Sequence, residues 1–224
     1  MAEWFRSNAL LLLLLAGTVF TFCWLMRQRR ALNLKWYTAL LAALAHTAWG
    51  VFCVKAFAFA EAGFDSDALG NMSLFGAVFF MPVFYFALAK TLRVKAKTVF
   101  DLCTICMLFT LMCARINCLI AGCCQGLHIP GSELRWPTRE LEILFYIAAM
   151  LVIAKKLRRG NTGGTIYPAY MMAYGIFRFI IEWFRVHSGS SALHPAHIFA
   201  ILSFLIGFSV YSELKKKLLG GKHQ

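Results

Sequence analysis

Acidic residues are scarce in this chain, whose 224 residues include 10 Asp and Glu against 23 Lys and Arg. Charged residues of both signs make up 15% of the chain, and hydrophobic residues make up 60%. A typical soluble domain has about 25% charged and about 45–50% apolar residues. The composition therefore excludes an ordinary soluble domain and a disordered chain, and it indicates a polytopic membrane protein.

The sequence also lacks the features of a multidomain chain and of a membrane β-barrel. Proline occurs five times, no linker rich in Gly, Pro or Ser divides the chain, and no internal repeat is visible. The sequence lacks the alternating segments of about ten residues that are typical of membrane β-barrels. Apolar residues form continuous runs instead, and roughly 20 residues of helix cross a bilayer core of about 30 Å.

We therefore predict an all-α fold, with residues 1–224 forming one integral membrane domain of seven transmembrane helices. The first run could also be a signal peptide. However, no small-x-small cleavage pattern closes that run and a basic cluster follows it directly, which favours a helix. The predicted spans are residues 9–26, 37–60, 72–92, 98–121, 139–154, 165–184 and 194–212.

The distribution of basic residues predicts the orientation of these spans. Four clusters of four basic residues, 16 of the 23, follow the first, third, fifth and seventh spans. Cytoplasmic loops are enriched in Lys and Arg, so we expect the N-terminus outside and the C-terminus in the cytoplasm. Topology then explains most of the positive charge, and no nucleic-acid partner is expected. The clusters are Arg27, Arg29, Arg30 and Lys35; Lys90, Arg93, Lys95 and Lys97; Lys155, Lys156, Arg158 and Arg159; and Lys215, Lys216, Lys217 and Lys222.

The sixth predicted span carries a polar stripe. Tyr174, Arg178, Glu182 and Arg185 are spaced four, four and three residues apart, which places them on one face of a helix. Charged residues within a membrane span face the bundle interior or a wet cavity. The stripe could be a structural pair of Arg178 and Glu182, or part of a site for an anionic ligand.

Two other spans send ionisable groups to the same depth. Arg115 follows the cytoplasmic Lys97 by 18 residues, or roughly 27 Å of helix, and Glu142 lies near the outer start of the fifth span. An arginine presents a planar fork that suits phosphate. These residues predict a phospholipid head-group pocket near the outer leaflet. The alternative is a buried ion network that ties the helices together.

The spacing of the eight cysteines gives little support for a metal site. Cys103 and Cys106 have the Cys-x-x-Cys spacing but lie in an apolar run, with no second ligand pair nearby. Cys118, Cys123 and Cys124 gather near the outer end of the fourth span. We expect a packing role for these three, or oxidation of the vicinal pair, and we expect no metal or other cofactor.

Three stretches resemble the bacterial prolipoprotein diacylglyceryl transferase family. Arg115-Ile-Asn-Cys-Leu-Ile-Ala-Gly-Cys-Cys-Gln-Gly126 is similar to Gly-Arg-Ile-Gly-(Asn/Cys)-Phe followed by Gly-Cys-Cys-Tyr-Gly. Trp136-Pro-Thr-Arg-Glu-Leu-Glu142 is similar to His-Pro-(Ser/Thr)-Gln-Leu-Tyr-Glu. Tyr174-Gly-Ile-Phe-Arg-Phe-Ile-Ile-Glu-Trp-Phe-Arg185 fits Tyr-Gly-x-x-Arg-x-x-x-Glu-x-x-Arg. The resemblance covers about residues 98–200.

The resemblance implies a reaction at the outer face of the bacterial plasma membrane. The family moves diacylglyceryl from phosphatidylglycerol to the lipobox cysteine of a prolipoprotein signal peptide and releases glycerol 1-phosphate. By this resemblance, Arg115 and Arg178 are the expected catalytic residues, which hold the lipid phosphate and stabilise the leaving group. The expected substrate-binding residues are Tyr174, Glu142, Glu182, Arg185 and Gly126.

One departure from the family concerns proton transfer. Phe75 stands where the family has a histidine, and a phenylalanine cannot take a proton. His128, His194 and His197 are candidate substitutes near the outer face, and His194 and His197 are the predicted alternative bases. Smaller departures are Ala77 and Asn117, where the family has glycines, Trp136 for His and Arg139 for Gln.

These departures leave two alternatives to the transferase. The first is a non-catalytic or different-substrate relative that binds anionic phospholipid or a lipidated partner. The second is a small transporter that uses intramembrane charges. No pair of broken helices and no inverted repeat supports a transporter.

Overall fold

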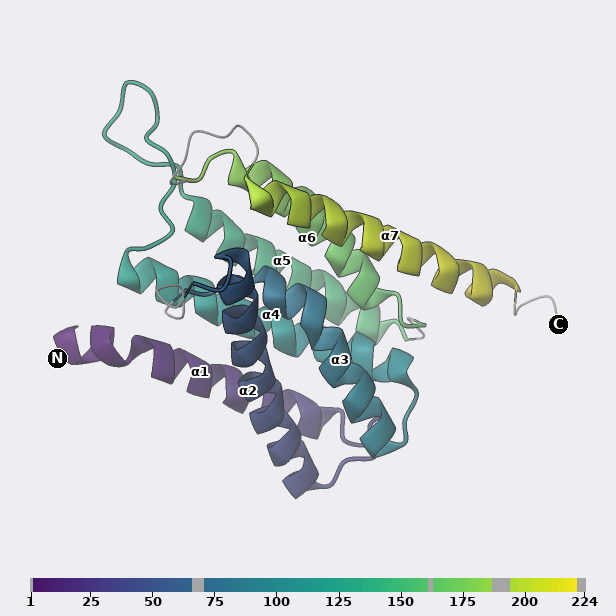
Figure 1. Ribbon diagram of the computed structural model, residues 1–224. Coiled ribbons are helices and arrows are strands. Elements are labelled where there is room, and N and C mark those ends of the chain that lie inside the picture. Colours follow the sequence, from purple (N-terminus) through teal and green to yellow (C-terminus); the bar gives the residue numbers. More distant parts are fainter. Residues whose placement is uncertain (1, 66–70, 161–162, 187–193, 221–224) are drawn as a thin grey trace.

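The computed structural model describes residues 2–65, 71–160, 163–186 and 194–220, and helices dominate this part of the chain (Figure 1). Two isolated β-bridges are the extended pairings found in the described ranges. The all-α prediction is therefore confirmed, and each predicted span overlaps one helix. The helices are α1 (Ala2–Arg27), α2 (Trp36–Glu61), α3 (Phe75–Leu92), α4 (Ala96–Ala121), α5 (Thr138–Arg158), α6 (Ile166–Glu182) and α7 (Pro195–Gly220).

Five of these helices, α1 to α4 and α7, are long and apolar enough to cross a membrane. The other two differ for visible reasons. Helix α6 has 17 residues and contains Arg178 and Glu182, and α5 ends in basic residues. The count of seven spans and the orientation of the termini therefore remain predictions.

Helix α4 is the centre of the bundle. It packs against α1, α3, α5 and α6, and it has the most buried apolar stretch of the five candidate spans. Tyr85 from α3 and Tyr167 from α6 pack on Phe100, near the start of α4. The Tyr85 hydroxyl donates to the Cys103 carbonyl at 3.1 Å. Groups on α4 are therefore held in place by neighbours on several sides.

A proline in α3 has its missing hydrogen bond replaced from another helix. Pro82 lacks the N–H that would bond the Val78 carbonyl, so this acceptor needs another donor inside the bundle. The Tyr167 hydroxyl on α6 donates to the Val78 oxygen at 2.6 Å. The proline is thus tolerated, and the hydrogen bond from Tyr167 to the Val78 carbonyl links α3 to α6.

Helices α6 and α7 lie side by side along one face of the bundle (Figure 1). Their contact depends on a glycine, because a Cβ at Gly175 would lie 2.6 Å from the Ala200 carbonyl oxygen. Small residues allow such close approach between helices in membranes. Ser203 on α7 also donates to the Met171 carbonyl at 2.9 Å. This pairing fixes the rotation of α6, and with it the direction of the polar stripe.

The four basic clusters lie at one end of the bundle. Ala31, Lys97, Gly160 and Leu218 come from the four regions that carry these clusters, and they line a single hollow. Lys222 of the fourth cluster lies outside the described residues. The structure therefore gathers the basic clusters at one end of the bundle, and the side of the membrane that this end faces remains a prediction.

Asp101 on α4 connects this end of α4 to the start of α6. Its carboxylate accepts hydrogen bonds from the Gly164 N–H at 2.7 Å and the Ile166 N–H at 3.1 Å. The first N–H groups of a helix have no partner within the helix, so the carboxylate satisfies donors that would otherwise be buried.

We expect Asp101→Ala to lower the free energy of unfolding by about 1–3 kcal/mol, because two backbone donors lose a charged acceptor. Thermal unfolding of the purified protein in detergent measures the loss. Glu213→Ala is the matched control, since Glu213 is exposed and pairs only with Lys216 on the surface of α7. Equal melting temperatures for the two variants would contradict this account of Asp101.

Candidate functional site

Glu142, near the start of α5, is the centre of a buried ion cluster. Its carboxylate pairs with the Arg115 Nε of α4, with the Arg178 Nη1 of α6 at 2.9 Å, and with the Arg185 Nη1 at 3.4 Å. Glu142 is 1% exposed. One carboxylate therefore joins three arginines, one from α4 and two from α6 and the segment that follows it.

Glu182 completes the cluster from the end of α6. Its carboxylate lies 2.9 Å from the Arg178 Nη2 and 3.9 Å from the Arg185 Nη1. Arg178 thus uses both terminal nitrogens to bridge the two carboxylates. The three arginines outnumber by one the two glutamates joined by these pairs. Buried charges are stable only when they are paired, so the third guanidinium needs either the Glu61 carboxylate, which lies at the same cavity, or an anionic ligand.

The arginines face a cavity of about 450 Å³. The cavity is large enough for a phosphate-bearing head group. Glu142 is not part of its wall but lies behind the arginines. The ionisable residues that line the cavity are Glu61, Arg115, Cys124, Arg178, Glu182, Arg185 and His194.

Phe75, the first residue of α3, forms an aromatic support for Arg178. The Arg178 guanidinium carbon lies 5.6 Å from the centre of the Phe75 ring, a cation–π distance. The Tyr174 ring packs edge-on against Phe75 at 5.6 Å. Phe75 therefore contributes to the position of the cation, although it cannot exchange a proton.

Two buried donors at this site lack a partner. The Arg178 Nε and the Tyr174 hydroxyl have no hydrogen-bond partner among the described residues. Such groups cost free energy unless they are satisfied. Arg178 lines the cavity, so a polar ligand there can satisfy its Nε. Tyr174 is fully buried and is not part of the cavity wall, so its hydroxyl requires ordered water or a ligand group that reaches behind the wall.

The loop between α4 and α5 is held against the end of α6 by extended backbone pairing. Gly126 forms a β-bridge with Arg185, the Leu127 N–H donates to the Phe184 carbonyl at 2.8 Å, and the Val186 N–H donates to the Gln125 carbonyl at 3.2 Å. A Cβ at Gly126 would clash with the Trp136 carbonyl oxygen. Gly126 thus acts through loop packing that positions Arg185.

The two predicted histidines have different surroundings. His194 lines the cavity, and its Nδ1 lies 3.9 Å from a Glu182 oxygen. His197 packs against the rings of Phe179 and Trp183 and is 2% exposed. The structure therefore brings His194 to the site and leaves His197 out of the cavity wall. His128 lies in the loop between α4 and α5, where it forms a β-bridge with Arg135.

The structure adds Glu61 and Cys124 to the site. Glu61 ends α2, and the sequence shows it only as an acidic residue beyond a predicted span. Cys124 follows the α4 cap with φ of 55°. A hydrogen bond with Cys118 and the charges of Arg115 and Arg185 lower the pKa of the Cys124 thiol. The doubled cysteine was a visible signal, but no sequence signal brings Glu61 to this cavity.

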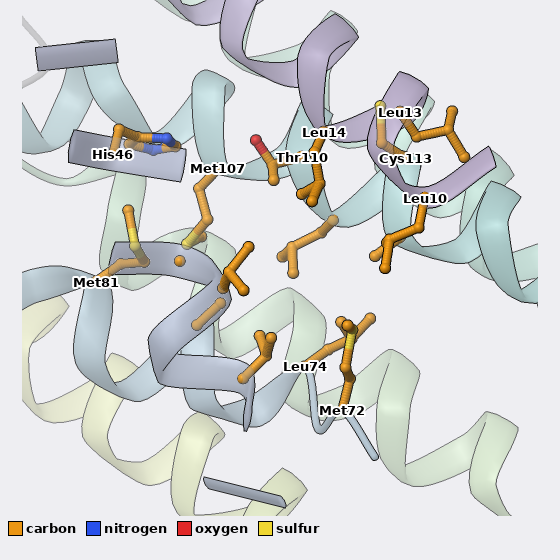
Figure 2. A pocket seen from close by; sticks show the side chains of 16 residues that line it. Leu10, Leu13, Leu14, His46, Met72, Leu74, Met81, Met107, Thr110 and Cys113 are labelled. Atoms are coloured by element: carbon orange, nitrogen blue, oxygen red, sulfur yellow. The ribbon is translucent and has the colours of Figure 1, made fainter. Parts of the chain in front are cut away.

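An apolar pocket adjoins the charged cavity. It lies between α1, α2, α3 and α4, and Figure 2 shows the side chains that surround it, with His46 at one end. Met72 and Leu74 belong to the walls of both the pocket and the cavity. A charged compartment and an apolar compartment thus share a boundary, as an amphiphilic ligand requires.

Comparison with known proteins identifies similar chains. The model of a family described as prolipoprotein diacylglyceryl transferase matches residues 12–212. Two curated proteins named phosphatidylglycerol–prolipoprotein diacylglyceryl transferase are similar to it. The protein of Clostridium tetani is 23% identical over 114 residues, or 44% of this chain, and that of Dehalococcoides mccartyi is 28% identical over 124 residues, or 46%. Each alignment spans 46% of the relative, so this chain matches less than half the length of both.

Proposed function

The chain belongs to the prolipoprotein diacylglyceryl transferase family, and from that premise we propose that it transfers diacylglyceryl from phosphatidylglycerol to the lipobox cysteine of prolipoproteins. The family and the apolar helices indicate a multi-pass bacterial membrane protein. The observation that carries the proposal is the convergence of Arg115, Arg178 and Arg185 on one cavity. We place this site toward the outer leaflet of the plasma membrane.

In the proposed complex, the lipid phosphate lies against the arginines. Arg115 and Arg178 are the catalytic residues, because their guanidinium groups would donate to the phosphate oxygens. Glu142 and Glu182 hold these groups in place before the substrate binds, so little reorganisation is needed during the reaction. Arg185 adds a third positive charge at the loop side of the cavity.

The proposed reaction forms one bond and breaks one. The sulfur of the acceptor thiolate attacks the glycerol C3 of the diacylglyceryl group, and the bond from this carbon to the phosphate oxygen breaks. Glycerol 1-phosphate leaves with the bonding electron pair. Negative charge therefore grows on the leaving phosphate, where preorganised arginines stabilise it.

The acceptor thiol must lose its proton, because the thiolate is the nucleophile. Phe75 cannot accept this proton. Glu61 and His194 line the cavity and carry groups that can. We propose that they pass the proton to solvent.

The apolar pocket supports a donor with acyl chains. Met72 and Leu74 lie between the arginine cavity and the pocket of Figure 2, whose volume of about 50 Å³ takes up a short part of a chain from a lipid whose phosphate occupies the cavity. Burying methylene groups there contributes binding free energy at roughly 0.8 kcal/mol each.

Transfer from labelled phosphatidylglycerol to a synthetic lipobox peptide tests the proposal. The purified chain in detergent should lipidate the peptide. A peptide with serine in place of the lipobox cysteine should remain unmodified, because a hydroxyl does not ionise at neutral pH. Folded protein that binds the lipid without any transfer would contradict the proposal.

The Phe75 substitution favours a second candidate, a relative that binds anionic phospholipid without transferring it. This candidate predicts lipid binding that depends on Arg178 but no lipidated peptide. Phe75→His separates the two, since it places an imidazole beside Arg178 and Tyr174. Transfer by Phe75→His but not by the natural chain would favour the second candidate.

A further inference from the structure

Three cysteine sulfurs meet at the outer end of α4. Cys118 lies in the last turn of the helix, Gly122 caps it in the left-handed conformation with φ of 73°, and the chain then turns back so that Cys123 and Cys124 approach Cys118. The three Sγ atoms all lie within 4.8 Å of one another. Residues five and six positions apart thus form one compact thiol group.

The surroundings of these thiols differ from those of packing cysteines. Cys103 and Cys106 are buried within α4, whereas Cys123 is exposed and Cys118 and Cys124 are half-buried. Cys124 also lines the arginine cavity. A free cysteine that only fills space is usually buried, so these three side chains are placed for chemistry rather than for packing.

The distances suit a soft metal ion. In a tetrahedral zinc site with Zn–S bonds of about 2.3 Å, the sulfurs lie roughly 3.8 Å apart. The sulfurs here would move together by about 1 Å, which small side-chain rotations can supply. Three protein ligands leave a fourth position for water or substrate, as in catalytic zinc sites. Thiolates select zinc or Cu(I) over hard cations.

Nearby arginines supply the charge and hydrogen bonds that such a site needs. Zn²⁺ with three thiolates has a charge of −1. The Arg115 Nη1 lies 4.0 Å from the Cys118 Sγ, and the Arg139 Nη1 donates to the carbonyls of Cys118 at 3.5 Å and Cys123 at 3.3 Å. Groups around the ligands that fix their geometry contribute to metal affinity. Arg139 thus braces the backbone on both sides of the helix cap.

We propose that Cys118, Cys123 and Cys124 bind one Zn²⁺ ion, and that the fourth position of this ion takes the sulfur of the acceptor cysteine. The first half concerns this chain alone, and the second rests on the proposed transferase function. The site lies at the cavity wall, where a thiol bound to zinc can face a phosphate held by Arg115 and Arg178. This arrangement gives the chain a means of ionising the acceptor without the histidine that Phe75 replaces.

The chemistry balances without an oxidant or reductant. When the acceptor thiol coordinates zinc, its S–H bond breaks and the proton passes to Glu61 or His194 and then to solvent. The zinc-bound thiolate then forms the S–C bond as the C–O bond to phosphate breaks. The thioether product is neutral and a weaker ligand, so water can displace it and free the site.

The zinc content of the purified protein tests whether the three cysteines bind the ion. Protein purified with reductant, loaded with Zn²⁺ and desalted should hold about one zinc per chain. Cys118→Ser and Cys124→Ser should lower this to background, while Cys23→Ser, which removes an exposed thiol on α1, should keep it. Absence of zinc from the folded natural chain overturns the proposal even if the variants do not fold. A disulfide within the cluster in natural protein prepared without reductant also overturns it.

Cobalt substitution tests the second half. Co²⁺ in the site should show thiolate charge-transfer and tetrahedral d–d absorption, and a lipobox peptide should change the d–d bands while its Cys→Ser form should not. Identical spectra with both peptides overturn the acceptor role. The failures are distinguishable: transfer by zinc-free protein at the full rate overturns the acceptor role of the metal, and it leaves the transferase and the zinc-binding half of the proposal. Zinc binding without transfer overturns the transferase and with it the acceptor role, and it leaves the metal site.

Discussion

Replacing Glu142 with alanine is expected to lower the free energy of unfolding by about 3–5 kcal/mol, the usual cost of removing one partner from a buried ion pair. Arg115, Arg178 and Arg185 all pair with this carboxylate, and Glu142 is 1% exposed. Without it, Arg115 loses its carboxylate partner, and Arg178 and Arg185 keep only their pairs with Glu182 among those described above. Thermal unfolding in detergent measures the loss.

Glu140→Ala is the matched control for this prediction. Glu140 lies two residues away on the same helix, its side chain is 43% exposed, and its carboxylate pairs with Arg139 at 3.9 Å. Exposed pairs contribute about 0–1 kcal/mol. If Glu142→Ala were no less stable than Glu140→Ala, the ion cluster would not hold the helices together.

Arg178→Lys is expected to reduce transfer by about 10²–10³-fold, as the loss of one preorganised oxyanion donor does in other enzymes. Lysine keeps the charge but cannot bridge two carboxylates as Arg178 does, with both Nη atoms at 2.9 Å. It also loses the planar contact with Phe75. The initial rate of peptide lipidation measures the effect.

The same conservative change in the loop between α4 and α5 provides the control. Arg135 is exposed, and Arg135→Lys should transfer at the natural rate. A folded Arg178→Lys variant with natural activity would remove Arg178 from the catalytic residues. Lipid binding measured on the same sample separates loss of chemistry from loss of affinity.

The polar stripe of α6 was predictable because its information is local. The spacing of Tyr174, Arg178 and Glu182 follows from the period of a helix. The prediction was wrong for Arg185, because α6 ends at Glu182 and Arg185 joins the cluster from the extended segment that pairs with Gly126. The expense of charge in an apolar span then directs this face inward. The helix rise between Lys97 and Arg115 likewise predicted that Arg115 lies at the same depth in the membrane as Glu142. The structure brings these two residues together.

Other parts of the site depended on contacts that no local pattern encodes. Glu61 reaches the cavity because α2 ends there. The residues that follow it form a loop, whose sequence does not show where the end of α2 lies. The thiol cluster depends on the left-handed cap at Gly122, which reverses the chain and brings Cys123 and Cys124 back toward Cys118. Hydrophobic periodicity contains no information about such a turn.

The same limit applies to His197 and Phe75. The sequence offers no reason to prefer His194 or His197 as a base. In the structure His194 lines the cavity, whereas His197, three residues later, packs against aromatic rings. The resemblance to the family shows that Phe75 replaces a histidine that could act as a base. Its contact with Arg178 required the packing of α3 against α6.

The fold shows a similar division. Long apolar runs predicted the helices well, because backbone groups in lipid must bond within a helix. The short α6 and the basic end of α5 do not meet the length and polarity expected of a free span. Glu142 on α5 and Arg178 on α6 are stabilised by pairing with each other across the two helices, and composition does not reveal such a pair.

The central claim is that this chain moves a diacylglyceryl group from a phosphodiester to a thiol at the arginine cavity. The most direct measurement follows both products of one reaction, with the purified chain, phosphatidylglycerol labelled in its head group and its acyl chains, and a lipobox peptide. We predict diacylglyceryl peptide and glycerol 1-phosphate in equal amounts, both lost in Arg178→Lys. Release of glycerol 1-phosphate without lipidated peptide, or equal products from Arg178→Lys, would contradict the account.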